Sequence, residues 1–206
     1  MKETTTPRGT GQWLDSGDGQ RWWFDSGALS LDFAYTGALN DGRAESGHWE
    51  KLQSPTDLGN WLADRFAHLD TTIGERELAD ALMLREAIAR LALAARRPAR
   101  PATSDVDVVN LFAATPDLPP VLAGGSRQAG ASRARAMQAL STIARDAVRT
   151  FGPDAEGRIR ACSADDCAIV YLDTSRSGNR RWCSMQRCGN RAKVRAHRSR
   201  SATRTG

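Results

Sequence analysis

Long apolar runs are missing from this chain of 206 residues. The longest apolar stretch covers residues 87–95, is interrupted by Arg90 and lies in a segment with helical patterning, so we expect no membrane span. The first 20 residues lack the apolar core of a secretory signal peptide, and we therefore expect a cytoplasmic protein. A hydrophobic content of 40% and a charged content of 26% indicate a soluble globular chain.

Motifs of the common enzyme classes are also missing. The chain has no nucleophile elbow, no phosphate-binding loop, no HExxH motif and no GxGxxG motif. His48 and His68 stand alone, and isolated histidines are more often structural than catalytic. We therefore expect that the protein is not an enzyme. A ligand cleft is the less favoured interpretation, and core packing the more favoured one, for Trp22, Trp23, Trp49 and Trp61.

Lysine is scarce, and the basic residues are unevenly distributed. Three of the 29 basic residues are lysines, which leaves 26 arginines. Residues 158–206 hold twelve basic and three acidic residues, a net charge of +9, whereas residues 1–157 carry a net charge of −4. A mildly acidic body with a strongly basic tail favours binding of the tail to a polyanion.

Cysteine is confined to one short segment. The only four cysteines follow the pattern Cys162-x4-Cys167-x15-Cys183-x4-Cys188. Four thiolates at about 2.3 Å form the tetrahedral ligand set of a structural zinc ion. The segment is too short to bury a large apolar core, so a metal would supply the missing cross-link. We predict that these four cysteines bind Zn²⁺.

The alternative for the cysteines is a pair of disulfides, for which three pairings exist. A chain without a signal peptide stays in a reducing compartment, where clustered cysteines are more often metal ligands. A redox role is disfavoured because both spacings are C-x4-C rather than C-x-x-C.

The N-terminal 36 residues divide into a polar segment and a segment with strand-like patterning. Residues 1–20 are polar and predict a disordered lead-in. Residues 21–36 predict two short strands around a Ser-Gly turn, with alternating apolar residues from Leu29 to Phe33.

Four helices are predicted farther along. A polar residue that can cap a helix marks each start. The expected starts are Ser54 followed by Pro55, Thr71 or Thr72, Ser104, and Ser132. Pro98 is expected to end the second helix and Gly152-Pro153 the fourth. A short strand is expected between the third and fourth helices, at Leu118, Val121 and Leu122.

The cysteine segment predicts a hairpin followed by a helix. Residues 168–173 are strand-like, residues 174–179 have turn composition, and residues 180–182 lead back to the second cysteine pair. A helix is expected after Cys183, with Ser184 as its cap. The predicted fold is therefore mainly α with a small N-terminal antiparallel sheet (α+β). It comprises a helical domain over residues 21–152, a zinc-bound module of β-hairpin plus helix over 158–200, and a flexible tail over 201–206.

Residues 171–198 closely resemble the CGNR zinc finger, named for the tetrapeptide found here as Cys188-Gly189-Asn190-Arg191. Members of that family carry the finger behind a helical domain called ABATE, regarded as a stress-induced transcription regulator. Its Leu-Asp-Phe-Val-Asn-Thr signature is similar to residues 31–36, which read Leu-Asp-Phe-Ala-Tyr-Thr. The resemblance implies zinc binding and a regulatory role with nucleic acid as the partner.

The basic residues of the finger support that role independently. On a helix, Arg187, Arg191, Arg195 and Arg198 would form one stripe that can neutralise phosphates. Arg180 and Arg181 precede the stripe and Lys193 lies beside it. A solvated face is the alternative for the stripe. Asn190 is of the type that reads adenine edges, although a structural bond at the metal knuckle is the favoured role for it.

Three functions remain open from the sequence. The leading one is a bacterial DNA-binding transcription regulator, whose helical domain senses an effector or dimerises. The second is an RNA-binding stress protein, which is disfavoured because the tail offers only Tyr171 and Trp182 for base stacking. The third is a ligand-binding or protein-interaction domain in which zinc is only a scaffold.

Overall fold

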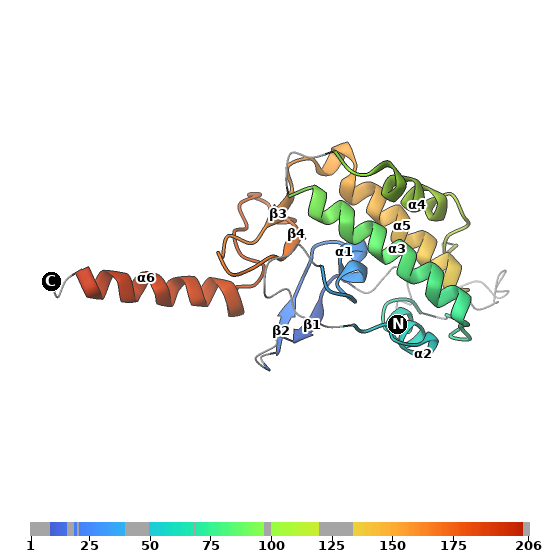
Figure 1. Cartoon of the computed structure of the whole chain (residues 1–206), viewed down its shortest axis with the longest axis horizontal. Helices are drawn as coiled ribbons and strands as arrows, with labels where there is room; N and C mark the ends of the chain where they lie inside the picture. Colours follow the sequence, from blue (N-terminus) through green and yellow to red (C-terminus); the bar gives the residue numbers. More distant parts are fainter. Residues whose placement is uncertain are drawn as a thin grey trace, which may run out of the picture.

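The fold is that of a computed structural model, which describes residues 9–15, 19, 21–39, 50–67, 69–96, 100–119 and 134–203. Side chains are described for all of these except residues 199 and 201–203. About half of the chain is helical, with two small antiparallel hairpins, one near each end (Figure 1). The predicted fold class is therefore confirmed.

The body is built on three long helices that lie side by side (Figure 1). They are α3 (Glu75–Ala94), α4 (Thr103–Ala113) and α5 (Ala136–Phe151), and the shorter α1 (Leu29–Ala34) and α2 (Pro55–Ala63) pack against them. Helix α5 is central because it contacts the other four. Buried residues recur on it at helical spacing, at Leu140, Ile143, Ala144 and Ala147.

The segment from Leu29 to Phe33 is helical, and the predicted strand there is wrong. All six residues of α1 are buried, including Ser30 and Asp32 between the apolar positions. Because both faces of the segment are enclosed, the alternation of apolar residues does not mark the face of a strand. The backbone N–H of Ser30 is satisfied from α5, by Asp146 Oδ2 at 2.7 Å.

The N-terminal hairpin lies earlier in the chain than predicted. Strand β1 (Gln12–Asp15) pairs antiparallel with β2 (Arg21–Phe24), with Trp13 directly opposite Trp23. The first strand thus falls inside the segment predicted as a disordered lead-in. Leu14, Trp22 and Phe24 point inward and are buried. These side chains attach the short hairpin to the body.

Local helix signals are confirmed only in part. Ser54 caps α2 as predicted, because its Oγ accepts from Asp57 N at 3.3 Å. Helix α3 begins after Gly74 rather than after a threonine, and Glu77 Oε2 accepts from the Gly74 N–H at 3.0 Å. Helix α4 begins at Thr103, so Ser104 lies inside it.

Helix α5 ends at Phe151, as predicted from Gly152-Pro153, and a short 3-10 turn, η1 (Pro153–Ala155), follows. Its start is formed by Arg135, whose N–H donates to Gln138 Oε1 at 2.9 Å. The predicted cap Ser132 lies outside the described residues. So do two of the three residues of the strand expected before it, and the third, Leu118, is not in a strand.

The C-terminal module contains the second hairpin, but with a different partner from the one predicted. Strand β4 (Val170–Leu172) pairs with β3 (Ile159–Ala161), which precedes it, and not with residues 180–182. This pairing places the first two cysteines in the connection between β3 and β4. Residues 180–182 instead cross that connection, where Ser163 N donates to Arg181 O at 2.9 Å.

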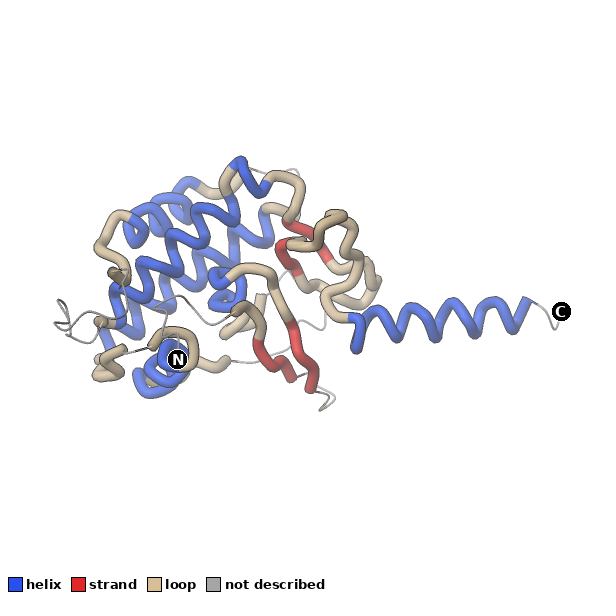
Figure 2. Tube along the Cα trace, turned by 180° about the vertical axis from the view of Figure 1, so that it is seen from behind, coloured by secondary structure: helices blue, strands red, loops and turns tan. Residues whose placement is uncertain are grey.

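The module ends in a π-helical turn, η2 (Met185–Gly189), followed by α6 (Asn190–Thr203). Helix α6 projects away from the body, as Figures 1 and 2 show from opposite sides. Within the described part of the chain, no helix has the length and apolar character needed to cross a membrane.

The module is docked on the body through β4. Tyr35 Oη donates to Val170 O at 3.0 Å and accepts from Val170 N at 2.7 Å. Leu172 N donates to Ser26 O at 2.8 Å. Gly27 has a φ of +80°, and a Cβ there would overlap the carbonyl oxygen of Leu172, so this close approach requires glycine.

Candidate metal centre and nucleic-acid interface

The four cysteines come together in one buried cluster. Their sulfur atoms all lie within 4.8 Å of one another. Cys167 Sγ is 3.8 Å from Cys183 Sγ, which in turn is 3.5 Å from Cys188 Sγ. A tetrahedron with bonds of about 2.3 Å has edges of about 3.8 Å, so the cluster fits a single four-coordinate metal ion. All four thiols are free, and these sulfur–sulfur distances are too long for a disulfide bond of about 2.05 Å.

Two tight chain reversals position the sulfurs. The first is the β3–β4 connection, where Cys162 N donates to Ile169 O at 2.9 Å. The second is the turn η2, where Gly189 N donates to Ser184 O at 3.0 Å. Gly189 is buried in this turn, and a Cβ there would lie 2.7 Å from the sulfur of Met185, so a larger residue would displace that side chain. Ser184 caps this turn through its backbone, and its side chain makes no cap bond.

Polar hydrogens and a positive charge surround the sulfurs. Cys183 N donates to Cys162 Sγ at 3.4 Å, and Arg191 Nη2 donates to Cys188 Sγ at 3.4 Å. Such contacts stabilise thiolates rather than thiols. Arg191, the arginine of the Cys-Gly-Asn-Arg tetrapeptide, therefore lies directly against the cysteine cluster.

Mutual hydrogen bonds divide the four thiols into two kinds. The contact with Cys167 lowers the pKa of Cys162 to about 7, and the contact with Cys162 lowers that of Cys188. The contact with Cys162 raises the pKa of both Cys167 and Cys183. A divalent ion that binds four thiolates must displace the remaining protons, so its affinity falls in acid.

The predicted basic stripe is partly engaged within the protein. Arg191 Nη1 and Arg195 Nη2 lie 3.1 Å and 2.9 Å from Asp166 Oδ2, so both guanidinium groups share one carboxylate. Arg187 lies over the ring of Trp22, 4.1 Å from its centroid. Lys193 and Arg198 are exposed on α6.

The two arginines before the second cysteine pair differ in their surroundings. Arg180 Nη2 donates to Asp25 O at 2.9 Å and its guanidinium lies 4.1 Å from the ring centroid of Tyr171, so Arg180 ties the module to the body. Arg181 is exposed and lies 5.2 Å from the ring centroid of Trp182.

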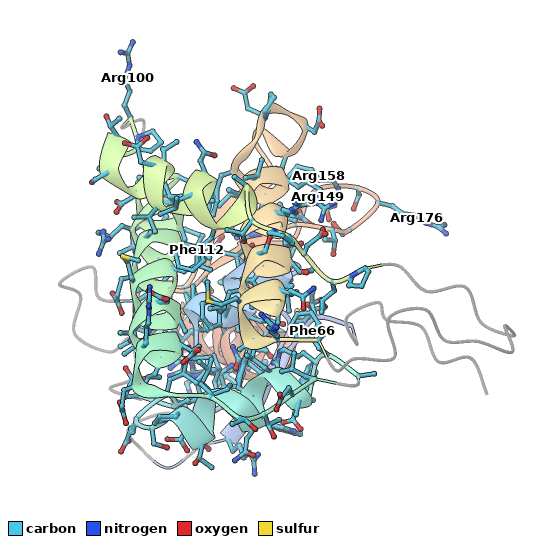
Figure 3. All side chains as sticks on the ribbon, turned by 90° about the vertical axis from the view of Figure 1, so that its right-hand side faces the viewer. Phe66, Arg100, Phe112, Arg149, Arg158 and Arg176 are labelled. Carbon is cyan, nitrogen blue, oxygen red and sulfur yellow. The ribbon has the colours of Figure 1, made fainter. Side chains whose placement is uncertain are left out.

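Asn190 is exposed, and its Nδ2 donates to Gln186 O at 3.4 Å. Arg176, in the turn of residues 174–179, is also exposed, and Figure 3 shows it pointing away from the module.

Two family models match the chain. A model described as CGNR zinc finger matches residues 158–201, which include all four cysteines. The ABATE model, described as "putative stress-induced transcription regulator", matches residues 27–153, more than half of the chain. The chain belongs to the ABATE family. The predicted resemblance to both families is thereby confirmed, and neither description names an enzyme. No curated protein matches the chain.

The first four residues of the ABATE signature word lie in α1, Tyr35 and Thr36 follow the helix, and the polar side chains of the word are bonded within the protein. Asp32 Oδ2 accepts from Gly11 N and Asp32 Oδ1 accepts from Ser26 Oγ, both at 2.6 Å. Burial raises the pKa of Asp32 to about 6, against the effect of these two donors. Tyr35, one of the two departures from the signature, is the residue that bonds the ABATE domain to Val170 of the CGNR finger.

Proposed function

We propose that the protein is a non-enzymatic, zinc-dependent transcription regulator of the bacterial cytoplasm that binds DNA through its CGNR finger. The observation that carries the proposal is the character of α6. The helix holds five basic residues and no acidic one, and each side chain from Lys193 to Arg198 is exposed. It extends from the finger without lying on the body (Figure 2).

A helix of this kind has little of its own to stabilise it. It has no apolar face to bury, and isolated helices of about this length are marginal in water. Phosphate groups along a nucleic-acid backbone would neutralise its charges and support it. Lys193, Arg195 and Arg198 are the side chains that we assign to phosphate contacts, with Arg181 and Arg187 nearer the start of the helix.

The finger would act as a rigid mount for this helix. Zinc, when bound to the four thiolates, supplies a tetrahedral cross-link between the two chain reversals. Arg191 and Arg195 hold Asp166, which lies between the first two cysteines, and so fix the first turns of α6 against the cluster. We assign base contacts to the exposed Asn190, at the end of the helix that meets the finger, while Arg191 keeps its place against Asp166 and Cys188.

Selection of the zinc-loaded protein against a random duplex DNA pool tests the proposal, with structured RNA as competitor at physiological salt. We expect enrichment of a defined duplex motif and one bound zinc per chain. The Cys183→Ser protein should lose the metal and the enrichment, because three thiolates and one hydroxyl no longer form the ligand set.

Two outcomes would overturn the proposal. A Cys183→Ser protein with full zinc content and full affinity for DNA would show that the cysteine cluster does not hold α6 in its binding position. Displacement of the duplex by RNA would indicate that the same surface binds RNA, which is the alternative function.

A further inference from the structure

Two tryptophans are exposed side by side on the outer face of the β1–β2 hairpin. Trp13 is 46% exposed and Trp23 is 43% exposed, whereas Trp22 and Trp61 are buried. The rings of Trp13 and Trp23 meet edge to face, with centroids 5.6 Å apart and planes at 78°. Exposed apolar side chains that adjoin one another, unlike scattered single ones, are a feature of interaction sites.

The tryptophan pair, Trp13 with Trp23, is held in place by its neighbours. Gly11 has a φ of +116°, and a Cβ there would lie 2.5 Å from the Trp23 ring, so this ring rests on the glycine backbone. Arg21 lies over the Trp13 ring, 5.0 Å from its centroid. A rigid pair loses little conformational entropy when a partner binds it.

Positive charge surrounds the tryptophan pair. Besides Arg21, Lys51 Nζ lies at the pair and donates to Trp13 O at 2.8 Å. Among the described residues of the two strands, Asp15, opposite Arg21, is acidic and is exposed on the same outer face. The balance favours a partner that combines flat apolar groups with negative charge.

The hairpin is also fixed to the finger. Arg187, in the turn η2 directly before α6, packs on the inward-facing Trp22 of strand β2. Arg180 of the finger donates to the carbonyl of Asp25, directly after the same strand. The hairpin and α6 therefore leave the molecule from neighbouring positions, as Figure 1 shows.

We infer that the tryptophan pair stacks on unpaired nucleobases of the nucleic acid that the finger binds. The inference rests on the proposed function and adds a preference for single-stranded segments beside the finger's site. Every base has a flat face that stacks on an indole ring, and Arg21 and Lys51 would attract the adjoining phosphates. A protein partner fits less well, because two four-residue strands offer far less than the about 800 Å² per partner of a stable protein interface.

Fluorescence anisotropy with the zinc-loaded full-length protein tests the inference. The probes are a blunt DNA duplex and the same duplex with a short single-stranded extension. The extension is made once as DNA and once as RNA. We expect the extended probe to bind roughly tenfold more tightly than the blunt duplex, in line with the usual strength of base–indole stacking. The extension chemistry that gives the larger gain identifies the source of the unpaired bases.

Two variants assign the gain to the tryptophan pair. A Trp13→Thr/Trp23→Thr protein keeps strand-forming residues in the hairpin and should bind both probes with the affinity of the blunt duplex. Leu111→Ala, which removes a 64% exposed apolar side chain from α4, should keep the full gain. Zinc content and melting temperature verify that each variant is folded.

The outcomes separate the inference from the proposed function. Binding of the blunt duplex without a gain from either extension would overturn the inference alone. Equal losses on both probes in the double variant would do the same. An absence of binding to every probe would overturn the proposed function and the inference together.

Discussion

At the scale of single residues, a buried carboxylate organises the N-terminal part of the body. Asp32 is fully buried and holds Gly11 and Ser26 with its two oxygens. The first of these residues supports the Trp23 ring and the second receives β4 of the finger. A single side chain thus connects the tryptophan pair, α1 and the docking site of the finger.

Asp32 should make stability depend on pH in an unusual direction. Burial raises its folded-state pKa from 3.8 to about 6, so its contribution is fully present below pH 3.8 and is lost as pH rises through about 6. Relative to Asp32→Asn, the wild-type free energy of unfolding should therefore be about 2 kcal/mol higher at pH 4 than at pH 7. Urea unfolding at a series of pH values measures this difference.

Both proteins keep the four cysteines, so loss of metal in acid affects them alike. A Ser26→Ala protein removes a donor that lowers the pKa of Asp32, and its transition should move to higher pH. Parallel stability curves for wild type and Asp32→Asn would contradict the prediction.

At the scale of elements, α6 differs from every other described helix of the chain. Helices α2, α3, α4 and α5 bury apolar residues, whereas α6 exposes Val194 along with its basic side chains. Its attachment depends on the cysteine cluster and on the shared carboxylate of Asp166. Its distal part is therefore available to a ligand without any rearrangement of the body.

Replacement of Arg198 by alanine should weaken DNA binding through one phosphate contact. The logarithm of the affinity falls linearly with the logarithm of the salt concentration, with a slope of about −0.9 per phosphate contact. Arg198→Ala should reduce the magnitude of that slope by about 0.9. Titrations of anisotropy over a range of salt concentrations measure it.

Arg100 provides the matched control for this prediction. It is an exposed arginine in the connection between α3 and α4, and Figure 3 shows its side chain pointing away from the body. Arg100→Ala changes the net charge by the same amount and should leave the slope unchanged. Equal slopes for wild type and Arg198→Ala would remove Arg198 from the phosphate contacts.

At the scale of the whole molecule, the finger and the body form a continuous structure. Tyr35 binds Val170, Ser26 binds Leu172, and Arg187 packs on Trp22. These contacts join α1 and the N-terminal hairpin to both halves of the finger. A change in the packing of the body would therefore alter the position of α6.

Tyr35→Phe should loosen this connection without touching the metal cluster. The substitution leaves the buried N–H and C=O of Val170 without their partner, which costs about 1–3 kcal/mol. The unfolding free energy should fall by about that amount, and amide hydrogen exchange in β4 should accelerate. Exchange in α3 should change less, because α3 lies within the body.

Tyr171→Phe is the internal comparison for that measurement. Its hydroxyl donates to Arg180 O at 2.6 Å inside the finger, so its loss should destabilise the finger without releasing β4 from Tyr35. Unchanged exchange at Val170 in Tyr35→Phe would show that this hydrogen bond does not hold the finger on the body.

Features encoded by a few neighbouring residues could be predicted from the sequence. The cap at Ser54 and the helix end before Gly152 depend on side chains within one helical turn. The cysteine spacing likewise restricts the chemistry, because four sulfurs at these intervals suit one tetrahedral ion. The helix α1 was missed because its burial on all sides comes from α3 and α5, which lie far away in the sequence.

The family, a candidate metal site at the four cysteines and the concentration of basic charge near the C-terminal end could be predicted from residue type and short-range spacing. Three further features are visible only once the chain is folded. Strand β3 is the partner of β4, Arg191 and Arg195 share Asp166, and Trp13 and Trp23 are exposed beside the finger. Each of these depends on contacts between segments distant in the sequence, whose geometry is set by packing of the whole core.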